Sequence, residues 1–250
     1  MRDNTSFDIR SKFWAEAGRD CITTDRPLLD VIVTSSVRDT IFRTIESFLE
    51  NVRFSGQFRF NVNVDCCYSR NVQKIENLFR GLSTGYFTVN DPPLGFTRSV
   101  ARLIRAVKTE YYFHLEDDWL FLRPIALDEL ITLLDNHGEI KHIRFSKEKI
   151  LPFDELYYLR KLKFVPMGYQ GFKTRNVFVE ETPLVETMNY SANPNISRTK
   201  HFRRIPYVNS LDIEQQFALH SFVKKVIFRR RSGYYIYGRI GDSASIQHIG

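Results

Sequence analysis

Two spacings of apolar residues alternate along the first 146 residues, and they predict alternating strands and helices. Short runs rich in β-branched and aromatic residues are typical of buried strands. They lie at residues 28–36, 58–65, 85–91, 111–121 and 140–146. Apolar residues three or four positions apart, which indicate one face of a helix, lie at residues 38–52, 71–82, 95–109 and 126–138. This order implies an α/β fold with a mostly parallel sheet covered by helices on both faces.

Beyond Ser146 the apolar pattern loses its regular period. We expect short strands and turns at residues 176–195, a helix at 210–225, and a hairpin or loop at 232–250. No linker rich in Gly, Ser or Pro interrupts the chain. The sequence therefore predicts a single domain over residues 1–250, with a regular half at 28–148 and a less regular half at 149–250.

Polar side chains follow each predicted strand directly. In a parallel sheet these positions share the carboxyl edge, where ligands of such folds bind. The polar residues in question are Thr34, Ser35, Ser36 and Arg38, then Asp65, then Asn90 and Asp91, and finally Glu116, Asp117 and Asp118. We expect the binding site at this edge.

Composition narrows the class of protein. The chain is 43% hydrophobic and 26% charged, which is typical of a globular protein. No apolar run approaches the ~20 residues of a membrane span, and the first residues show no secretory signal. Three cysteines, two of them adjacent, argue against a disulfide framework and for a reducing compartment. We therefore expect a cytoplasmic protein.

A formal net charge of +7 favours anionic partners. The basic runs KHFRRI (200–205) and VKKVIFRRR (223–231) are compatible with a peripheral contact to the inner face of an anionic membrane, and equally with a solvated face.

The acidic triplet Glu116–Asp117–Asp118 ends an otherwise apolar strand. If the strand persists to Asp118, alternation places Glu116 and Asp118 on one face and Asp117 on the other. Two such carboxylates form a hard oxygen site suited to Mg²⁺ or Mn²⁺, completed by phosphate oxygens and water. The alternative is that the acids cap the following turn or pair with Arg123 or a lysine.

The order of these motifs resembles the GT-A class of nucleotide-sugar glycosyltransferases, most closely the inverting family 2. The matching segments are VIVTSSVRD, NVNVDCC ending its strand at Asp65, the glycine-opened helix LGFTRSVARLIRAV, and YYFHLEDDW in place of an Asp-X-Asp motif. The match covers residues 28–148 well and the remainder loosely. It departs at Glu-Asp-Asp and at the loop CCYSRN after Asp65.

The resemblance implies roles for individual residues. Asp118 would bind the metal, and Glu116 would lie near the ribose or the metal. Asp65 would accept hydrogen bonds from the base, which suggests uracil or another base with a ring N–H, with a UDP-sugar as the favoured donor. The predicted nucleotide-sugar-binding set is completed by Thr34, Ser36, Arg38, Gly95, Arg98 and Asp117. For Arg98, at the start of a helix aimed at the diphosphate, a solvated helix face is the alternative.

Inverting transfer needs a carboxylate that takes a proton from the acceptor hydroxyl. In the similar family this acid lies at the start of a late helix, and NSLDIEQQFALHSF offers Asp212 and Glu214. If Asn209 or Ser210 caps this helix, Asp212 lies in its first turn, which leaves Glu214 as the better base.

The ending SIQHIG resembles the late His that reaches the metal in GT-A enzymes, so His248 is a predicted ligand. An imidazole ligand fits Mn²⁺ better than Mg²⁺.

The predicted function is metal-dependent transfer of a sugar, with inversion, from a nucleotide-diphosphate sugar to a saccharide or lipid-linked acceptor, as in surface polysaccharide assembly. We expect no nucleic acid partner. Two alternatives remain open. One is a two-metal nuclease or phosphodiesterase. Such enzymes usually need an acid on the first core strand, and the sole acid there, Asp30, lies at the beginning of the strand and thus at the wrong edge of the sheet. The other is a catalytically silent nucleotide-sugar or carbohydrate-binding module, in which aromatic residues of the second half stack on sugars. The sequence does not indicate the oligomeric state.

Overall fold

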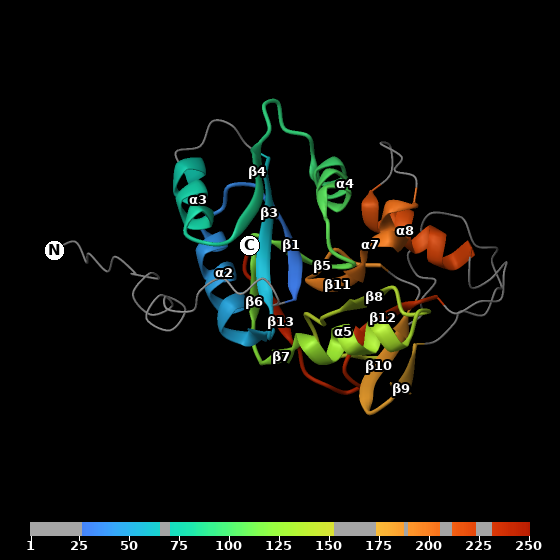
Figure 1. Cartoon of the computed structure of the whole chain (residues 1–250). Coiled ribbons are helices and arrows are strands. Elements are labelled where there is room, and N and C mark those ends of the chain that lie inside the picture. Colours follow the sequence, from blue (N-terminus) through green and yellow to red (C-terminus); the bar gives the residue numbers. More distant parts are fainter. Residues whose placement is uncertain (1–26, 66–70, 153–173, 188–189, 206–211, 224–231) are drawn as a thin grey trace.

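The computed structural model describes residues 27–65, 71–152, 174–187, 190–205, 212–223 and 232–250 (Figure 1). One large sheet runs through the molecule in the order β4-β3-β1-β5-β11-β8-β12-β10-β9. Its strands are β1 (Leu28–Ser35), β3 (Gln57–Val64), β4 (Thr84–Val89), β5 (Tyr111–Glu116), β8 (His142–Arg144), β9 (Arg175–Val179), β10 (Thr182–Thr187), β11 (Asn195–Arg198) and β12 (Tyr234–Tyr237).

Strand directions confirm the mostly parallel sheet. Strands β4, β3, β1 and β5 are mutually parallel, and β8 is parallel to β12. Strand β11 is antiparallel to both β5 and β8, and β10 is antiparallel to both β12 and β9. Of the strands described in this sheet, β11 and β10 alone therefore run against the common direction.

Helices cover both faces of the sheet, as Figure 1 shows. Helices α2 (Thr40–Asn51), α3 (Asn71–Arg80) and α5 (Leu127–Asn136) pack on one face. Helices α4 (Phe96–Ala106), α7 (Thr199–Arg203) and α8 (Ile213–Phe222) pack on the other. Alternation along β1 supplies both layers, because Val31 and Val33 join the first core and Ile32 joins the second.

Two short sheets complete the fold. Strand β2 (Val52–Arg53) pairs with β7 (Ile125–Ala126), and β6 (Trp119–Phe121) pairs with β13 (Ile246–His248). The expected hairpin or loop at 232–250 is wrong. Its first strand, β12, enters the large sheet between β8 and β10, and its last strand, β13, crosses to β6.

The two halves of the sequence share the large sheet. Strand β11 comes from the second half, yet it lies between β5 and β8 of the first half. None of the helices in the described ranges combines the length and the hydrophobicity that a membrane crossing requires.

Candidate active site

The carboxyl ends of β1, β3 and β5 meet the start of α4 around a cavity of about 280 Å³, which we call the donor cavity. Its lining residues are Thr34, Ser35, Ser36, Arg38, Asp65, Phe96, Ser99, Glu116, Asp117 and Asp118. Most of the predicted nucleotide-sugar-binding residues are thus brought together, although they come from segments up to 84 positions apart, counting from Thr34 to Asp118.

All three residues of the acidic triplet face this cavity. Strand β5 ends at Glu116, and Asp117 and Asp118 form a turn before β6. The expectation that Asp117 points to the opposite face is therefore wrong, because the turn ends the alternation of side chains. The Asp117 carboxylate accepts hydrogen bonds from Ser35 Oγ (2.8 Å) and from the backbone N–H of Ser36 (2.7 Å).

The Asp118 carboxylate lies beside a residue from the other end of the chain. Its Oδ2 lies 3.1 Å from His248 Nε2 and accepts a hydrogen bond from Arg38. The backbone N–H of Ile249 donates to the carbonyl of Asp118 (2.9 Å). The structure thus brings together the two residues that were predicted to bind metal.

Arg123, which the sequence offered as a partner for these acids, donates instead to Ser245 Oγ (2.6 Å). The alternative that the acidic triplet pairs with Arg123 is therefore wrong.

Burial and mutual repulsion disfavour the charged forms of the carboxyl groups at this site. Burial raises the pKa of Glu116 to about 8, and the nearby charges of Asp118, Glu214 and Asp117 act in the same direction. Burial also raises the pKa of Asp117 above its usual range, although hydrogen bonds from Ser35 and Ser36 oppose that shift. A bound cation would offset the repulsion among these groups.

The side chains at this site fit a divalent cation that takes its remaining ligands from outside the protein. Asp118 Oδ1 is buried and has no hydrogen-bond partner within the described part of the chain, so one carboxylate oxygen remains to coordinate an ion. Among the described residues, no three His, Cys, Asp or Glu side chains converge to form a complete metal site. Magnesium and similar ions are commonly held by one or two protein groups together with substrate phosphates and water.

Asp65 lines the donor cavity but also holds the loop that precedes α4. Its carboxylate accepts hydrogen bonds from the backbone N–H groups of Leu94 and Gly95, each at 2.6 Å, and from Asn90 Nδ2 at 3.1 Å. Gly95 has a φ of 80°, a left-handed conformation that favours glycine. Gly95 therefore serves the loop geometry and does not line the cavity.

Arg98 does not line the donor cavity. It is exposed in the first turn of α4, whereas Phe96 and Ser99, three positions apart, face the cavity. Helical spacing could have predicted these two residues, because they share the face of α4 that also carries the buried Val100 and Leu103.

Glu214 lies in the first turn of α8, and Asp212 is the N-cap of that helix. The Asp212 side chain accepts a hydrogen bond from the backbone N–H of Glu214 (2.8 Å). The expectation that Asp212 lies within the first turn is therefore wrong, because Asp212 is itself the N-cap. The cap candidates Asn209 and Ser210 lie outside the described residues. Glu214 Oε1 accepts hydrogen bonds from Ser191 Oγ (3.0 Å) and from the N–H of Ala192.

A second cavity of about 640 Å³, which we call the acceptor cavity, lies beside Glu214. The residues that line it near this carboxylate are Tyr190, Ser191, Asn193, Asp212 and Gln215. Because the charge of Glu214 raises the pKa of Glu116, the two cavities lie within electrostatic range of each other. The predicted sugar-stacking aromatics Tyr157, Tyr158, Phe164, Tyr169 and Phe172 lie outside the described residues.

No family model and no curated protein matches the sequence. Solved structures do match. S. aureus TarS 1–349 has a TM-score of 0.55 and 13% identity, with 88% of this chain and 60% of that chain covered. The same fragment in complex with UDP-GlcNAc has a TM-score of 0.54 and 14% identity, with 88% and 57% covered. A longer TarS structure has a TM-score of 0.55 and 15% identity, with 90% and 37% covered.

The chain therefore spans less than two thirds of each TarS structure. At this identity the likeness concerns the fold, and it agrees with the sheet order and helix layers above. The protein has a mostly parallel α/β fold like that of a GT-A glycosyltransferase.

Proposed function

We propose that the protein is a glycosyltransferase that moves a sugar, with inversion, from a nucleotide-diphosphate sugar to a hydroxyl of a saccharide or lipid-linked acceptor. The observation that carries the proposal is the convergence of Asp65, Asp118 and Arg38 on one cavity at the carboxyl edge of the sheet, with Glu214 close by. This edge is where ligands bind in open α/β folds.

The donor cavity suits a nucleotide diphosphate. Arg38 offers a guanidinium, a group that binds phosphate well, from a side chain that is 48% exposed. The hydroxyl of Ser36 is available beside it at the cavity wall. A UDP-sugar is the favoured donor, since structures of the similarly folded TarS contain UDP and UDP-GlcNAc.

Asp118 and His248 would hold the metal, with Mn²⁺ favoured over Mg²⁺ because imidazole is one of the ligands. When bound, such an ion neutralises charge on the departing diphosphate. The Arg38 guanidinium would leave Asp118 and bind the phosphates, whose negative charge it would help to neutralise.

Glu214 is the proposed general base. Its carboxylate would take the proton from the acceptor hydroxyl while the hydroxyl oxygen attacks the anomeric carbon. The bond from that carbon to the diphosphate breaks, and the nucleoside diphosphate leaves from the opposite face. The hydrogen bonds from Ser191 and Ala192 engage Glu214 Oε1, and Oε2 would be the oxygen that takes the proton.

The nuclease alternative has little support from the described residues. Asp30, the one acid of β1, is fully buried near the opposite edge and is bound to Arg59. We propose a cytoplasmic protein, with any membrane contact peripheral and made through basic residues.

The donor proposal is tested by thermal shift with UDP, GDP and dTDP, each with and without Mn²⁺. We expect UDP with Mn²⁺ to raise the Tm, and Asp118→Asn to weaken that metal-dependent binding by about tenfold or more. Glu76→Gln, which removes a surface carboxylate on α3, is the matched control and should bind as the wild type does. Failure of every nucleotide, together with stabilisation by single-stranded DNA, would contradict the proposal.

The role of Glu214 is tested separately. Glu214→Gln should retain UDP binding and lose roughly 10²–10⁴-fold in sugar transfer, because the amide cannot accept the proton. Retained turnover in this variant would remove Glu214 as the base. Nucleotide binding by the wild type without transfer to any acceptor would favour the silent binding module.

A further inference from the structure

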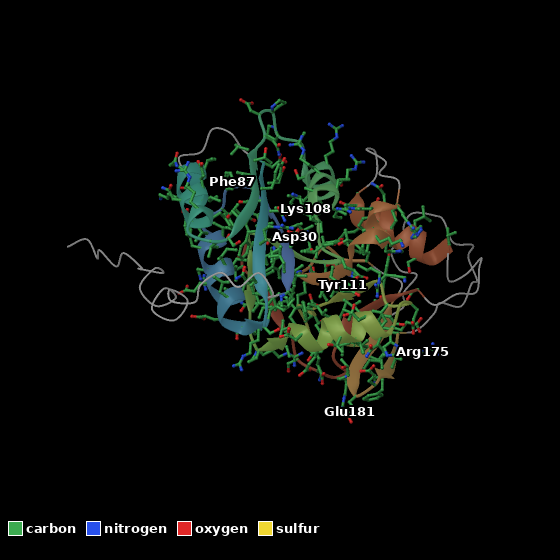
Figure 2. All side chains as sticks on the ribbon, in the orientation of Figure 1. Asp30, Phe87, Lys108, Tyr111, Arg175 and Glu181 are labelled. Atoms are coloured by element: carbon green, nitrogen blue, oxygen red, sulfur yellow. The ribbon has the colours of Figure 1, made fainter. Side chains whose placement is uncertain are left out.

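A third cavity, of about 630 Å³, lies at the C-terminal end of α4 and shares no lining residue with the donor or acceptor cavities. We call it the basic groove. The described residues that line it are Arg59, Asn61, Gly85, Tyr86, Arg105, Ala106, Val107, Lys108 and Arg203. Figure 2 labels Lys108 and Asp30 close together beside α4, and the N–H of Lys108 donates to Asp30 Oδ2 (2.6 Å).

One of the four cations in the groove is already neutralised. Arg59 donates to both carboxylate oxygens of Asp30, with Nε–Oδ1 at 2.6 Å and Nη2–Oδ2 at 2.8 Å. Burial alone would raise the pKa of Asp30, but hydrogen bonds from Arg59, Lys108 and Asn61 outweigh it and lower that pKa. Asp30 therefore stays ionised beneath the groove and balances Arg59.

The charge of Arg203 is not balanced in the same way. Its guanidinium donates to the backbone carbonyls of Ile104, Arg105 and Val107, which are neutral acceptors at the end of α4. These bonds hold the guanidinium in place at the groove, where the partial negative charge of the helix C-terminus balances part of its positive charge.

Arg105 and Lys108 add two exposed cations, and none of the described lining residues is acidic. Arg105, Lys108 and Arg203 thus line one concave surface together with the Arg59–Asp30 pair.

The shape of the groove depends on a glycine. A Cβ atom at Gly85 would lie 2.7 Å from Arg59 Cδ, so the absence of a side chain allows Arg59 to lie across β4. The large hydrophobic residues that are exposed in the described ranges, Leu28, Val89, Leu122, Leu151 and Phe178, all lie outside the groove. A concave, charged surface without exposed large apolar side chains favours a polyanionic chain over insertion into a membrane.

We propose that the basic groove binds phosphate groups of a linear polyanion, at a site separate from the proposed transfer chemistry. Guanidinium groups match phosphate oxygens by paired hydrogen bonds, and Lys108 adds a mobile point charge. The proposal stands whether or not the donor cavity binds a nucleotide, because the two cavities share no residue.

The test uses long-chain inorganic polyphosphate as the probe and the double variant Arg105→Ala/Lys108→Ala. Arg43→Ala/Lys74→Ala, on α2 and α3, removes the same two types of charge from exposed positions elsewhere and is the matched control. We expect the groove variant to bind polyphosphate about tenfold more weakly at low salt. The salt dependence of binding should also become less steep by about one to two units of log–log slope. Equal losses in the two double variants would overturn the proposal.

Vesicles provide the second arm of the test. Sedimentation with vesicles of anionic phospholipid and of neutral phosphatidylcholine should show no difference between the groove variant and the control. If the groove variant loses binding to anionic vesicles while its binding to polyphosphate is unchanged, the groove faces a membrane and the polyanion proposal is wrong. The UDP-dependent rise in Tm is measured on the same samples, so failure of the donor proposal is recognised separately.

Discussion

At the scale of single residues, His114 occupies an unusual position in the middle of the sheet. It is fully buried, and neither ring nitrogen has a hydrogen-bond partner among the residues that the structure describes. The ring of Phe96 stacks near it at a centroid distance of 6.3 Å. Burial lowers the pKa of His114 from its usual 6.5 to about 3, so the imidazole is neutral in the folded protein at physiological pH.

This residue predicts how stability depends on pH. Between pH 6.5 and about pH 3 the unfolded chain binds a proton at His114 that the folded chain does not, so stability falls as the pH falls through this window. At pH 5 the loss relative to pH 7 is about 2 kcal/mol from this group. His114→Phe should therefore show a flatter stability curve between pH 7 and pH 5, as measured by urea unfolding.

The slopes of the curves decide this prediction, because the substitution also changes packing at every pH. His137→Gln, at a half-buried position next to Glu180, is the control and should retain the wild-type slope. A slope for His114→Phe equal to that of the wild type would mean that His114 is protonated in the folded state.

At the scale of elements, the start of α8 places the proposed base. Asp212 caps the helix through the N–H of Glu214, and so it acts on the backbone of the residue whose side chain enters the acceptor cavity. Capping and proton transfer are different demands on a side chain, since a cap needs only an oxygen acceptor.

Two substitutions at Asp212 separate these roles. Asp212→Asn keeps an acceptor oxygen and should retain both stability and most of the sugar-transfer rate. Asp212→Ala should lower the free energy of unfolding by about 1 kcal/mol and reduce the transfer rate through displacement of Glu214. Loss of transfer in Asp212→Asn, with unchanged stability, would instead identify Asp212 as the base.

Elements with a strong local pattern could be predicted from the sequence, and elements defined by distant partners could not. Helices α2, α3, α4 and α5 fall within the predicted ranges because each carries a long apolar face. Strand β11 is only four residues long and contains Asn195 and Ser197, so its sequence lacks an apolar period. Its place beside β5 depends on pairing with residues about 80 positions earlier in the chain.

In the candidate site, too, some side-chain positions could be predicted from local sequence and others could not. The polar residues at the ends of β1, β3 and β5 could be predicted, because the carboxyl ends of parallel strands meet at one edge. The orientation of Asp117 could not, because it depends on a turn within an apparently continuous strand. Local spacing also did not reveal that Asp65 is engaged by Leu94 and Gly95.

At the scale of the whole molecule, residues near the C-terminus complete a site built mainly by the first half of the chain. Strand β13 pairs with β6 outside the large sheet. This pairing places the His248 imidazole beside the Asp118 carboxylate and against the Trp119 ring. The position of the imidazole therefore depends on the pairing of two short strands.

Removal of the strand and removal of the imidazole should have different consequences. Ending the chain after Ser245 deletes β13, so we expect a lower Tm and loss of the Mn²⁺-dependent gain in UDP binding. His248→Gln keeps the strand pairing and should retain the Tm while weakening the Mn²⁺ effect by about tenfold. Calorimetry and titration with UDP, with and without Mn²⁺, measure both. An unchanged Mn²⁺ effect in both variants would show that His248 is not a ligand.

The insertion of β11 between β5 and β8 limits how the gene can be divided. A cut between residues 148 and 149 would leave the first fragment with β8 separated from β5 by an empty position, and the second with β11 lacking both neighbours. Neither fragment would hold its hydrogen-bonded edges alone, whereas co-expression could allow the missing strand to enter from the other piece. Restoration of the large sheet would therefore require both fragments to be present together.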